Sequence, residues 1–256
     1  MSATAARGRL LLVPNALDLG AATAPELRDV LPLGVIRRAA VLTHWVAENA
    51  KSARAFLKRV AAVEPLALAL QDIRIAELPR LPKGRAGGLP ASAFDALLAP
   101  ALEGHDLGLL SEAGLPAVAD PGAALVAAAH TAGIVVEPLP GPSSLMLALA
   151  ASGLDGQSFA FVGYLPVEAA ARSARIRDLE ALSRRSGQTQ LMIETPYRNA
   201  ALLDALLATL APSTRLAVAC GLTLAGGWTC SARVTQWRAE RSTLPGDVPA
   251  VFALLA

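Results

Sequence analysis

The chain alternates short apolar runs with longer stretches of helical spacing. Arg9–Val13, Asp106–Leu110 and Ile134–Glu137 are mainly apolar runs, each followed within a few residues by proline or glycine. Between such runs, as in Asn49–Val63, apolar residues recur at intervals of three and four, which predicts an amphipathic helix. Strands that alternate with helices favour parallel pairing through right-handed crossovers. The N-terminal part is therefore expected to form an α/β domain around a parallel sheet.

Further elements of this part are expected from apolar runs and helix signals. A helix opens after Pro25, and the helix before Asp106 takes Ser92 as its N-cap. The remaining expected elements are a helix over Glu26–Val30, an apolar run over Ala40–Val46, a strand within Leu66–Ile75, and helices over Ser92–Leu102 and Ala123–Thr131.

The pattern of predicted helices and strands changes after Pro142. The first element predicted there is a helix over Ser143–Ala151. Only two long helices, Val167–Arg185 and Asn199–Leu210, separate the strands that follow. Those strands are predicted over Phe159–Gly163, Gln190–Glu194, Leu216–Cys220, Arg233–Trp237 and Val248–Leu254. The glycine pair before Trp228 indicates a hairpin and some antiparallel pairing. The expected domains are residues 1–142 with a parallel sheet and residues 143–256 with a mixed sheet.

Composition limits the classes of function. With 54% hydrophobic and 17% charged residues, the chain is expected to be globular, and its net charge of +2 permits a nucleic-acid partner without demanding one. Cys220 and Cys230 are too few for a disulfide framework, and no residues have metal-ligand spacing. No run approaches the ~20 apolar residues of a membrane span, so a cytoplasmic protein is expected.

Two loops stand out because each follows a predicted buried strand and leads into a helix. They are Leu110–Gly122 and Pro138–Ser144. Ligands of open α/β sheets bind outside the carboxyl ends of strands, and glycine lets the backbone approach them closely. Neither loop is a phosphate-binding motif. A ligand that carries adenosine and a carboxylate but no phosphate suits this pair of loops.

The same two loops carry a family resemblance. Leu110–Gly122 resembles the Ser-Asp-Ala-Gly-Thr-Pro-x-x-Ser-Asp-Pro-Gly signature of the tetrapyrrole methylase superfamily, in the form used by its ribosomal RNA ribose 2′-O-methyltransferases. Pro138–Ser144 is similar to the Pro-Leu-Pro-Gly-Pro segment of those proteins. Three further family segments match in order and spacing, at Ser152–Leu154, Phe161–Pro166 and Glu194–Arg198.

The resemblance implies two α/β domains, a homodimer, and S-adenosylmethionine (SAM) as cofactor. It implies methyl transfer to ribosomal RNA or to the small ribosomal subunit. Carried over by position, the implied cofactor contacts are Pro14, Ser111, Ala113, Gly114, Leu115, Val118, Ser143, Ser144, Glu194 and Leu222.

Two segments depart from the family pattern, so the sequence does not identify the molecule that accepts the methyl group. The family's Glu-Asp-Thr-Arg is here Glu48–Lys51, and its Arg-Glu-x-Thr-Lys is here Cys220–Leu224. Two alternatives therefore stand beside RNA methylation: a methyltransferase acting on a tetrapyrrole or other small substrate, and a non-catalytic SAM-binding relative. The candidate catalytic residues are Glu112, Glu48 and Tyr197, with His44 and Asp120 as further candidates for the same region.

Basic residues offer a surface for RNA phosphates. Lys83 and Arg85 lie in a Gly/Pro-rich loop. A second group is predicted on one long helix, where it would otherwise be an ordinary solvated face: Arg172, Arg175, Arg177, Arg184 and Arg185.

Overall fold

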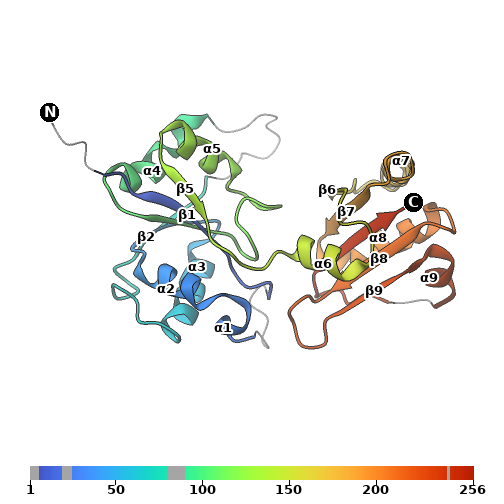
Figure 1. The fold of residues 1–256 in the computed structure, drawn as a ribbon, viewed down its shortest axis with the longest axis horizontal. Helices are drawn as coiled ribbons and strands as arrows, with labels where there is room; N and C mark the ends of the chain where they lie inside the picture. Colours follow the sequence, from blue (N-terminus) through green and yellow to red (C-terminus); the bar gives the residue numbers. More distant parts are fainter. Residues whose placement is uncertain (1–5, 19–24, 80–89, 241–242) are drawn as a thin grey trace. The chain divides into compact units, whose positions relative to one another are not determined.

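The computed structural model describes residues 6–18, 25–79, 90–240 and 243–256. Contacts between residues divide the chain into two compact units, Met1–Pro142 and Ser143–Ala256. Figure 1 shows the N-terminal unit in blue to green and the C-terminal unit in yellow to red. Within the described residues, no helix has the length and apolar character needed to cross a membrane.

The N-terminal unit is built on a five-stranded parallel sheet of order β3-β2-β4-β1-β5, which confirms the predicted pairing. Its elements are β1 (Arg9–Val13), α1 (Leu27–Val30), α2 (Leu33–Val41), β2 (His44–Ala47), α3 (Ala50–Ala61), β3 (Arg74–Glu77), a 3-10 turn η1 (Ala91–Phe94), α4 (Asp95–Leu102), β4 (Leu107–Leu110), α5 (Ala123–Thr131) and β5 (Val135–Pro138).

Helices cover both faces of this sheet. Figure 1 shows α2 and α3 on one side of it and α4 and α5 on the other. Leu11 and Trp45 pack against α2 and α3, whereas Leu10 and Val46 pack against α4 and α5. Neighbouring residues of one strand thus bury opposite faces, which explains why the strands read as continuous apolar runs.

Two local predictions in this unit were wrong, and one apolar run is divided between two elements. The strand expected within Leu66–Ile75 begins only at Arg74, because the apolar residues before it pack against the α2–α3 core from turns. The apolar run Ala40–Val46 holds the end of α2 and the start of β2. Ser92 lies inside η1, and the N-cap of α4 is Phe94, without a side-chain capping hydrogen bond.

The C-terminal unit contains a mixed five-stranded sheet of order β6-β7-β10-β8-β9, in which only β6 and β7 are parallel neighbours. This confirms the predicted mixed sheet. Its elements are α6 (Ser144–Ser152), β6 (Phe159–Tyr164), α7 (Ala169–Ser186), β7 (Thr189–Glu194), a 3-10 turn η2 (Pro196–Arg198), α8 (Asn199–Thr209), β8 (Arg215–Cys220), β9 (Trp228–Arg233), α9 (Val234–Glu240) and β10 (Ala250–Leu255).

Alternation along β10 separates the two faces of this sheet. Phe252 and Leu254 pack with α7, α8 and α9, whereas Val251 and Ala253 pack with α6. The expected hairpin is present, formed by β8 and β9.

The strand predicted over Arg233–Trp237 was wrong. It is mostly helix α9, since Val234 and Trp237, one helical turn apart, both enter the core. The indole Nε1 of Trp237 donates to the carbonyl of Leu216 at 2.8 Å, which fixes α9 against β8.

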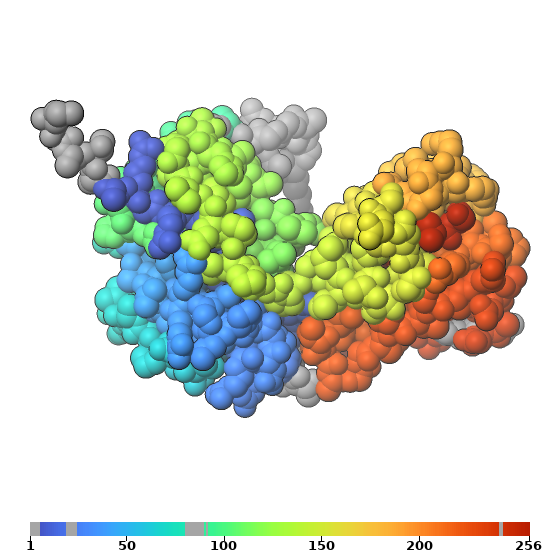
Figure 2. All heavy atoms as spheres, in the orientation of Figure 1, coloured from blue at the N-terminus to red at the C-terminus, as the bar shows by residue number. Residues whose placement is uncertain are grey.

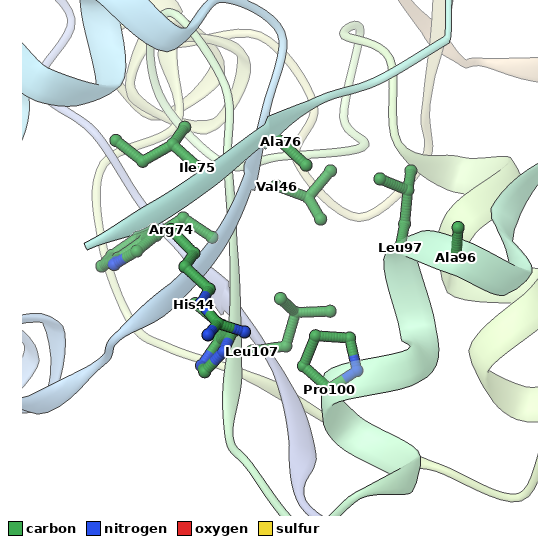
Figure 3. A pocket seen from close by; sticks show the side chains of 10 residues that line it. His44, Val46, Arg74, Ile75, Ala76, Ala96, Leu97, Pro100 and Leu107 are labelled. Atoms are coloured by element: carbon green, nitrogen blue, oxygen red, sulfur yellow. The ribbon is translucent and has the colours of Figure 1, made fainter. Parts of the chain in front are cut away.

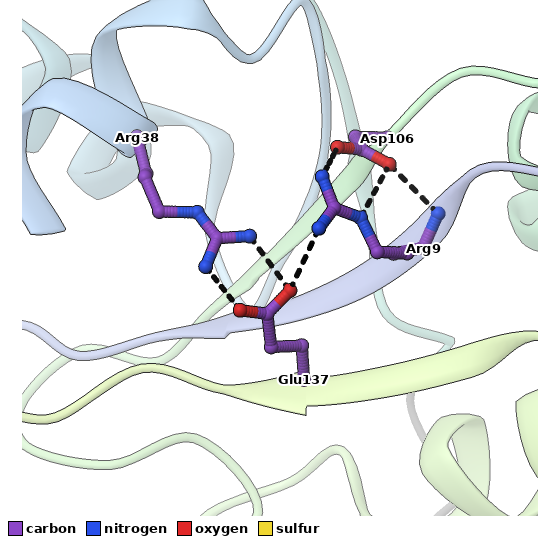
Figure 4. Close-up of polar contacts among 4 residues, drawn as sticks. All are labelled: Arg9, Arg38, Asp106 and Glu137. Carbon is purple, nitrogen blue, oxygen red and sulfur yellow. Dashed lines mark hydrogen bonds and ion pairs between the residues drawn. The ribbon is translucent and has the colours of Figure 1, made fainter.

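A four-residue ion network ties the edge strand β5 to the rest of the parallel sheet (Figure 4). Arg9 on β1 donates to Asp106 at 2.7 Å and to Glu137 on β5 at 3.1 Å. Arg38 on α2 donates hydrogen bonds from both terminal nitrogens to the same Glu137 carboxylate. The guanidinium of Arg38 lowers the pKa of Glu137, and that of Arg9 lowers the pKa of Asp106. The network therefore joins two strands and a helix.

Removing the shared carboxylate should loosen this junction. We expect Glu137→Gln to lower the free energy of unfolding by about 1 kcal/mol at pH 7. Carboxyl groups with lowered pKa stabilise the fold above their unfolded pKa, and this stabilisation is lost as pH falls through the folded value. The deficit of the variant, measured by denaturant unfolding, should thus shrink between pH 7 and pH 3.

Glu64→Gln is the matched control, because among the described residues Glu64 pairs with Arg37 alone, at 3.4 Å. Its effect should stay within about 0.5 kcal/mol at both pH values. Equal losses of stability in the two variants would contradict a special role for the network.

Candidate functional site

The carboxyl ends of the parallel strands meet at one edge of the N-terminal sheet. Val13 and Ala47 both pair with Leu110 in register, and Pro138 pairs with Leu12. Both loops singled out in the sequence, and the segments that follow β1 and β2, therefore begin at this edge. This is the edge at which open α/β sheets bind ligands.

Asn15 joins the segment after β1 to the loop after β4. Its backbone forms a reciprocal pair of hydrogen bonds with Gly114, at 2.9 and 3.1 Å. Its buried side chain donates from Nδ2 to the carbonyls of Ser111 at 3.2 Å and Glu112 at 3.0 Å. Nothing in the sequence signalled this role, because an asparagine after a strand is typical of any turn.

Gly141 brings the loop after β5 against the same segment. A Cβ on Gly141 would lie 2.3 Å from the Cβ of Pro14, well below the 3.0 Å under which non-bonded Cβ contacts essentially never fall. A Cβ on Gly114 would approach Leu17 at 3.2 Å and the carbonyl of Pro142 at 3.5 Å. The loops after β1, β4 and β5 thus pack into one surface, which we call the three-loop surface: residues 14–17, 111–122 and 139–142.

The middle loop has an unusual backbone conformation. Gly114 and Gly122 have positive φ, and so do Ala117 at 65° and Ala119 at 64°. An alanine in the left-handed region costs roughly 1–2 kcal/mol. Such conformations cluster at functional sites, where the surrounding structure holds them in place. The sequence could not reveal them, because alanine carries no signal for this region.

Three carboxyl groups lie together at the three-loop surface: Glu112 and Asp120 belong to it, and Glu48 follows the neighbouring strand β2. Burial raises the pKa of Glu48 to about 7; the negative charges of Asp120 and Glu112 add to the rise, and a backbone hydrogen bond from Glu112 opposes it. Oε1 of Glu48 is buried without a hydrogen-bond partner in the described part of the chain. A carboxyl group with these properties can take or give a proton near neutral pH.

Each of the other two carboxyl groups accepts a hydrogen bond from a serine. Burial and the charge of Glu112 raise the pKa of Asp120, while a hydrogen bond with Ser111 counteracts part of the rise. Glu112 accepts a hydrogen bond from the hydroxyl of Ser52 on α3, at 2.8 Å. The structure thus brings together the predicted candidates Glu48, Glu112 and Asp120, and adds Ser52 as the residue that orients one of them.

The predicted cofactor contacts of the N-terminal unit all lie on the three-loop surface. Pro14, Ser111 and Gly114 are buried, and Ala113 and Leu115 are half-buried. Val118 is 43% exposed and is the contact with the most accessible side chain. Among the described residues, no group of three His, Cys, Asp or Glu side chains could hold a metal ion.

The remaining predicted residues belong to the C-terminal unit. Ser143 is the N-cap of α6 and makes no side-chain capping bond, and Ser144 opens the helix. Glu194 is buried at the end of β7, where it accepts from the backbone of Thr195 at 2.8 Å and pairs with Arg198 at 2.7 Å.

Two further predicted residues of this unit differ in exposure. Tyr197 is 76% exposed. Leu222 is partly buried against the α6 side of the sheet.

His44 does not lie with Glu48, contrary to the sequence-based expectation. It begins β2, whereas Glu48 follows the last residue of that strand. The two side chains are therefore at opposite edges of the parallel sheet, because each residue of a strand adds about 3.3 Å of length.

Neutralising Glu48 should change how stability depends on pH. The pKa of this group is higher in the folded than in the unfolded chain, so its contribution is full below about pH 4.5 and is lost as pH rises through about 7. We expect Glu48→Gln to stabilise the protein at pH 8 by roughly 1–2 kcal/mol, a discounted value because the side chain keeps some contact with solvent.

Denaturant unfolding at pH 4 and pH 8 measures this effect. The two proteins should be about equally stable at pH 4, where the wild-type carboxyl is mostly protonated in both the folded and the unfolded chain. Asp72→Asn removes an exposed carboxylate of the same unit and should leave the pH dependence unchanged. A Glu48→Gln profile parallel to that of wild type would show that Glu48 has an ordinary pKa.

Comparison with known proteins places this geometry in a family. A family model described as Tetrapyrrole (Corrin/Porphyrin) Methylases matches residues 33–230, more than three quarters of the chain. Among solved structures, the methyltransferase CobJ has a TM-score of 0.56 at 18% identity, covering 97% of this chain and 94% of that one. A uroporphyrin-III C-methyltransferase from Thermus thermophilus, complexed with S-adenosyl homocysteine, has a TM-score of 0.51 at 19% identity, covering 97% of both chains.

Curated relatives are more similar in sequence but over a shorter stretch. A protein named ribosomal RNA small subunit methyltransferase I from Xylella fastidiosa is 44% identical over 117 residues, covering 46% of this chain and 41% of its own length. The protein of the same name from Mesorhizobium japonicum is 39% identical over 127 residues, covering 50% and 42%. The alignments thus span less than half the length of these relatives. The family match over most of the chain, together with the shared fold, is decisive: the chain belongs to the tetrapyrrole (corrin/porphyrin) methylase family.

Proposed function

We propose that this protein is a SAM-dependent methyltransferase that modifies a ribose 2′-hydroxyl of small-subunit ribosomal RNA. The observation that carries the proposal is the three-loop surface, on which Asn15, Gly114 and Gly141 hold three loops together beside an ionisable carboxyl cluster. The names of the curated relatives support ribosomal RNA as the substrate.

The residues present suit the cofactor. No lysine or arginine occurs among residues 14–18, 111–122 and 138–144, so nothing on these loops repels a positively charged sulfonium. The carboxyl groups of Glu48, Glu112 and Asp120 favour a cation nearby. When bound, SAM would supply an electrophilic methyl group. The residues that would hold it are Pro14, Ser111, Ala113, Gly114, Leu115, Val118, Ser143, Ser144, Glu194 and Leu222.

The chain's own contribution to the chemistry would be proton removal. A ribose hydroxyl must lose its proton as it is methylated, and a base works best when its pKa is close to the working pH. Burial gives Glu48 such a pKa, and Glu112, held by Ser52, keeps the surroundings negative. We therefore propose Glu48 as the base and Glu112 as a positioning residue, with Tyr197 as the remaining candidate for contact with the acceptor.

Binding of the cofactor can be tested through its charge. A substitution at Gly114 is unsuitable, because its positive φ strains any side chain and disturbs the loop itself. Val118 is exposed on the same loop, so Val118→Lys should fold normally and place a positive charge beside the sulfonium. We expect calorimetry to show about tenfold weaker binding of SAM to this variant, roughly 1.4 kcal/mol, with a smaller loss for neutral S-adenosylhomocysteine.

Val118→Gln is the control for side-chain size and should change the affinities for the two ligands by the same factor. If wild-type protein binds neither ligand, the proposed cofactor is wrong. If Val118→Lys binds both ligands normally, the middle loop is not the site. Binding of SAM without methyl transfer to RNA or to a tetrapyrrole would favour the non-catalytic alternative, and transfer to a tetrapyrrole alone would favour the small-substrate alternative.

The basic residues of α7 are spread around the helix rather than on one face. Figure 2 shows the golden atoms of α7 on the surface of the C-terminal unit. At about 100° per residue, Arg177 and Arg184 project from one flank, two turns apart, while Arg175 and Arg185 project elsewhere. Arg172 is half-buried and donates to the carbonyl of Val167 at 3.2 Å.

Arg184 also lies 3.8 Å from Glu180. Lys83 and Arg85, the other predicted basic group, lie outside the described residues. Because Arg177 and Arg184 are exposed and share one flank of α7, this flank is the part of the predicted RNA surface that the described residues support best.

RNA binding through this flank predicts a specific salt dependence. Removing one arginine that neutralises a phosphate should reduce the slope of log affinity against log salt by about 0.7 for single-stranded RNA. We expect Arg177→Gln combined with Arg184→Gln to reduce the slope by about 1.4 in binding titrations with ribosomal RNA. Affinity for SAM should stay unchanged.

The pair Arg175→Gln and Arg185→Gln removes the same charge from other sides of α7 and should change the slope less. Equal effects of the two pairs would mean that RNA binds α7 without a preferred flank. Absence of RNA binding at low salt would remove the ribosomal RNA proposal and leave the cofactor proposal standing.

We propose that the protein is a homodimer, as the family resemblance implies, and that it acts in the cytoplasm, as expected from the sequence.

A further inference from the structure

A cavity lies in the N-terminal unit, away from the three-loop surface. It has a volume of about 320 Å³ and is formed by strands β2 and β3 together with helix α4 (Figure 3). Its walls are mainly apolar and include Val46, Leu97, Pro100 and Leu107. The strand residues His44 and Leu107, which open β2 and β4, place one end of the cavity at the amino edge of the sheet.

The polar groups of this cavity gather at that end. Figure 3 shows the guanidinium of Arg74 beside the imidazole of His44. Arg74 has no ion pair or side-chain hydrogen bond among the described residues, whereas Arg9, Arg38 and Arg59 of the same unit are each paired with a carboxylate. An unpaired guanidinium at the mouth of an apolar cavity is available to bind an anion.

The neighbours of His44 hold its ring in place through Nδ1 and leave Nε2 available for a ligand. Its Nδ1 is 3.0 Å from the hydroxyl of Thr43, and its ring stacks on that of His105 at 4.9 Å. No described group hydrogen-bonds to Nε2. Burial lowers the pKa of His44, the charges of His105 and Arg74 lower it further, and Glu103 opposes them. The imidazole is therefore neutral at pH 7 and can offer one N–H to a ligand.

We propose that this cavity binds a compact organic carboxylate, held by Arg74 and His44 at its charged end and by the apolar walls along its body. A guanidinium presents two parallel N–H groups that match the two oxygens of a carboxylate. A small number of convergent polar groups in an otherwise apolar pocket is typical of small-molecule sites. A single cation with Glu103 nearby suits one negative charge better than the two of a phosphomonoester.

Benzoate is a suitable probe, because it is rigid, carries one carboxylate and has an apolar ring. We expect saturable binding at about millimolar affinity, measured by the NMR signals of the His44 ring and by calorimetry. The anion should raise the pKa of His44 in the complex, so the imidazole titration itself should shift upward. Benzamide, which has the same shape without the charge, should bind at least tenfold more weakly.

Two variants test the assignment. Arg74→Gln, at an exposed position, should weaken the binding of benzoate at least tenfold. Ala96→Leu, on the exposed side of α4, should fill the cavity without disturbing the helix and should thereby weaken benzoate binding as well. Arg54→Gln removes an exposed arginine of the same unit and should leave binding unchanged.

Absence of saturable benzoate binding to wild-type protein would overturn the proposal, as would equal binding of benzamide or unchanged binding by Arg74→Gln. Tighter binding of phenyl phosphate than of benzoate would overturn the carboxylate assignment. None of these outcomes depends on whether the protein is a methyltransferase.

Discussion

The contact between Gly141 and Pro14 is the constraint on which the candidate site depends. No side chain fits between these two residues, so the loop after β5 lies directly on the segment after β1. That segment is in turn held to the loop after β4 through Asn15. Three loops that are far apart in sequence therefore behave as one surface. The strain of Ala117 and Ala119 can persist there because the neighbouring loops leave the backbone little freedom.

The same packing explains the chemistry of the carboxyl cluster. Glu48 follows β2 directly, and the loop that carries Glu112 and Asp120 approaches it from the adjacent strand β4. Partial burial and like charges then make ionisation of Glu48 unfavourable, while Ser52 and Ser111 provide hydrogen bonds for the other two groups. One carboxyl group of three is thus set apart as a proton acceptor or donor, through its surroundings rather than its residue type.

Much of the fold could be predicted from the sequence because buried parallel strands have short apolar sequences, as in Leu107–Leu110. The helix Ala123–Thr131 also lies where the sequence predicted it. Prediction was wrong where the same residues suit two structures: Val234 and Trp237 fit a strand by composition and a helix by spacing. The site was predictable as two loops, but not in its detail. The bridging role of Asn15 and the positive φ of Ala117 arise from tertiary contacts, and the arginines of α7 form a group in sequence that the helix distributes over several sides.

The small residues beneath α6 have a consequence for the position of its first turn. Ala217, Ala219 and Ala253 form the face of the mixed sheet on which Leu145 and Leu149 rest, so the helix sits close to its strands. Ser144 is the first residue of that helix and Ser143 its N-cap, and their height above the sheet depends on the size of side chains that are distant in the sequence. A larger residue at any of these three alanines would lift the helix. A change in the middle of the sheet would then be transmitted to the start of α6, so the positions of Ser143 and Ser144 depend on residues that are distant from them in the sequence.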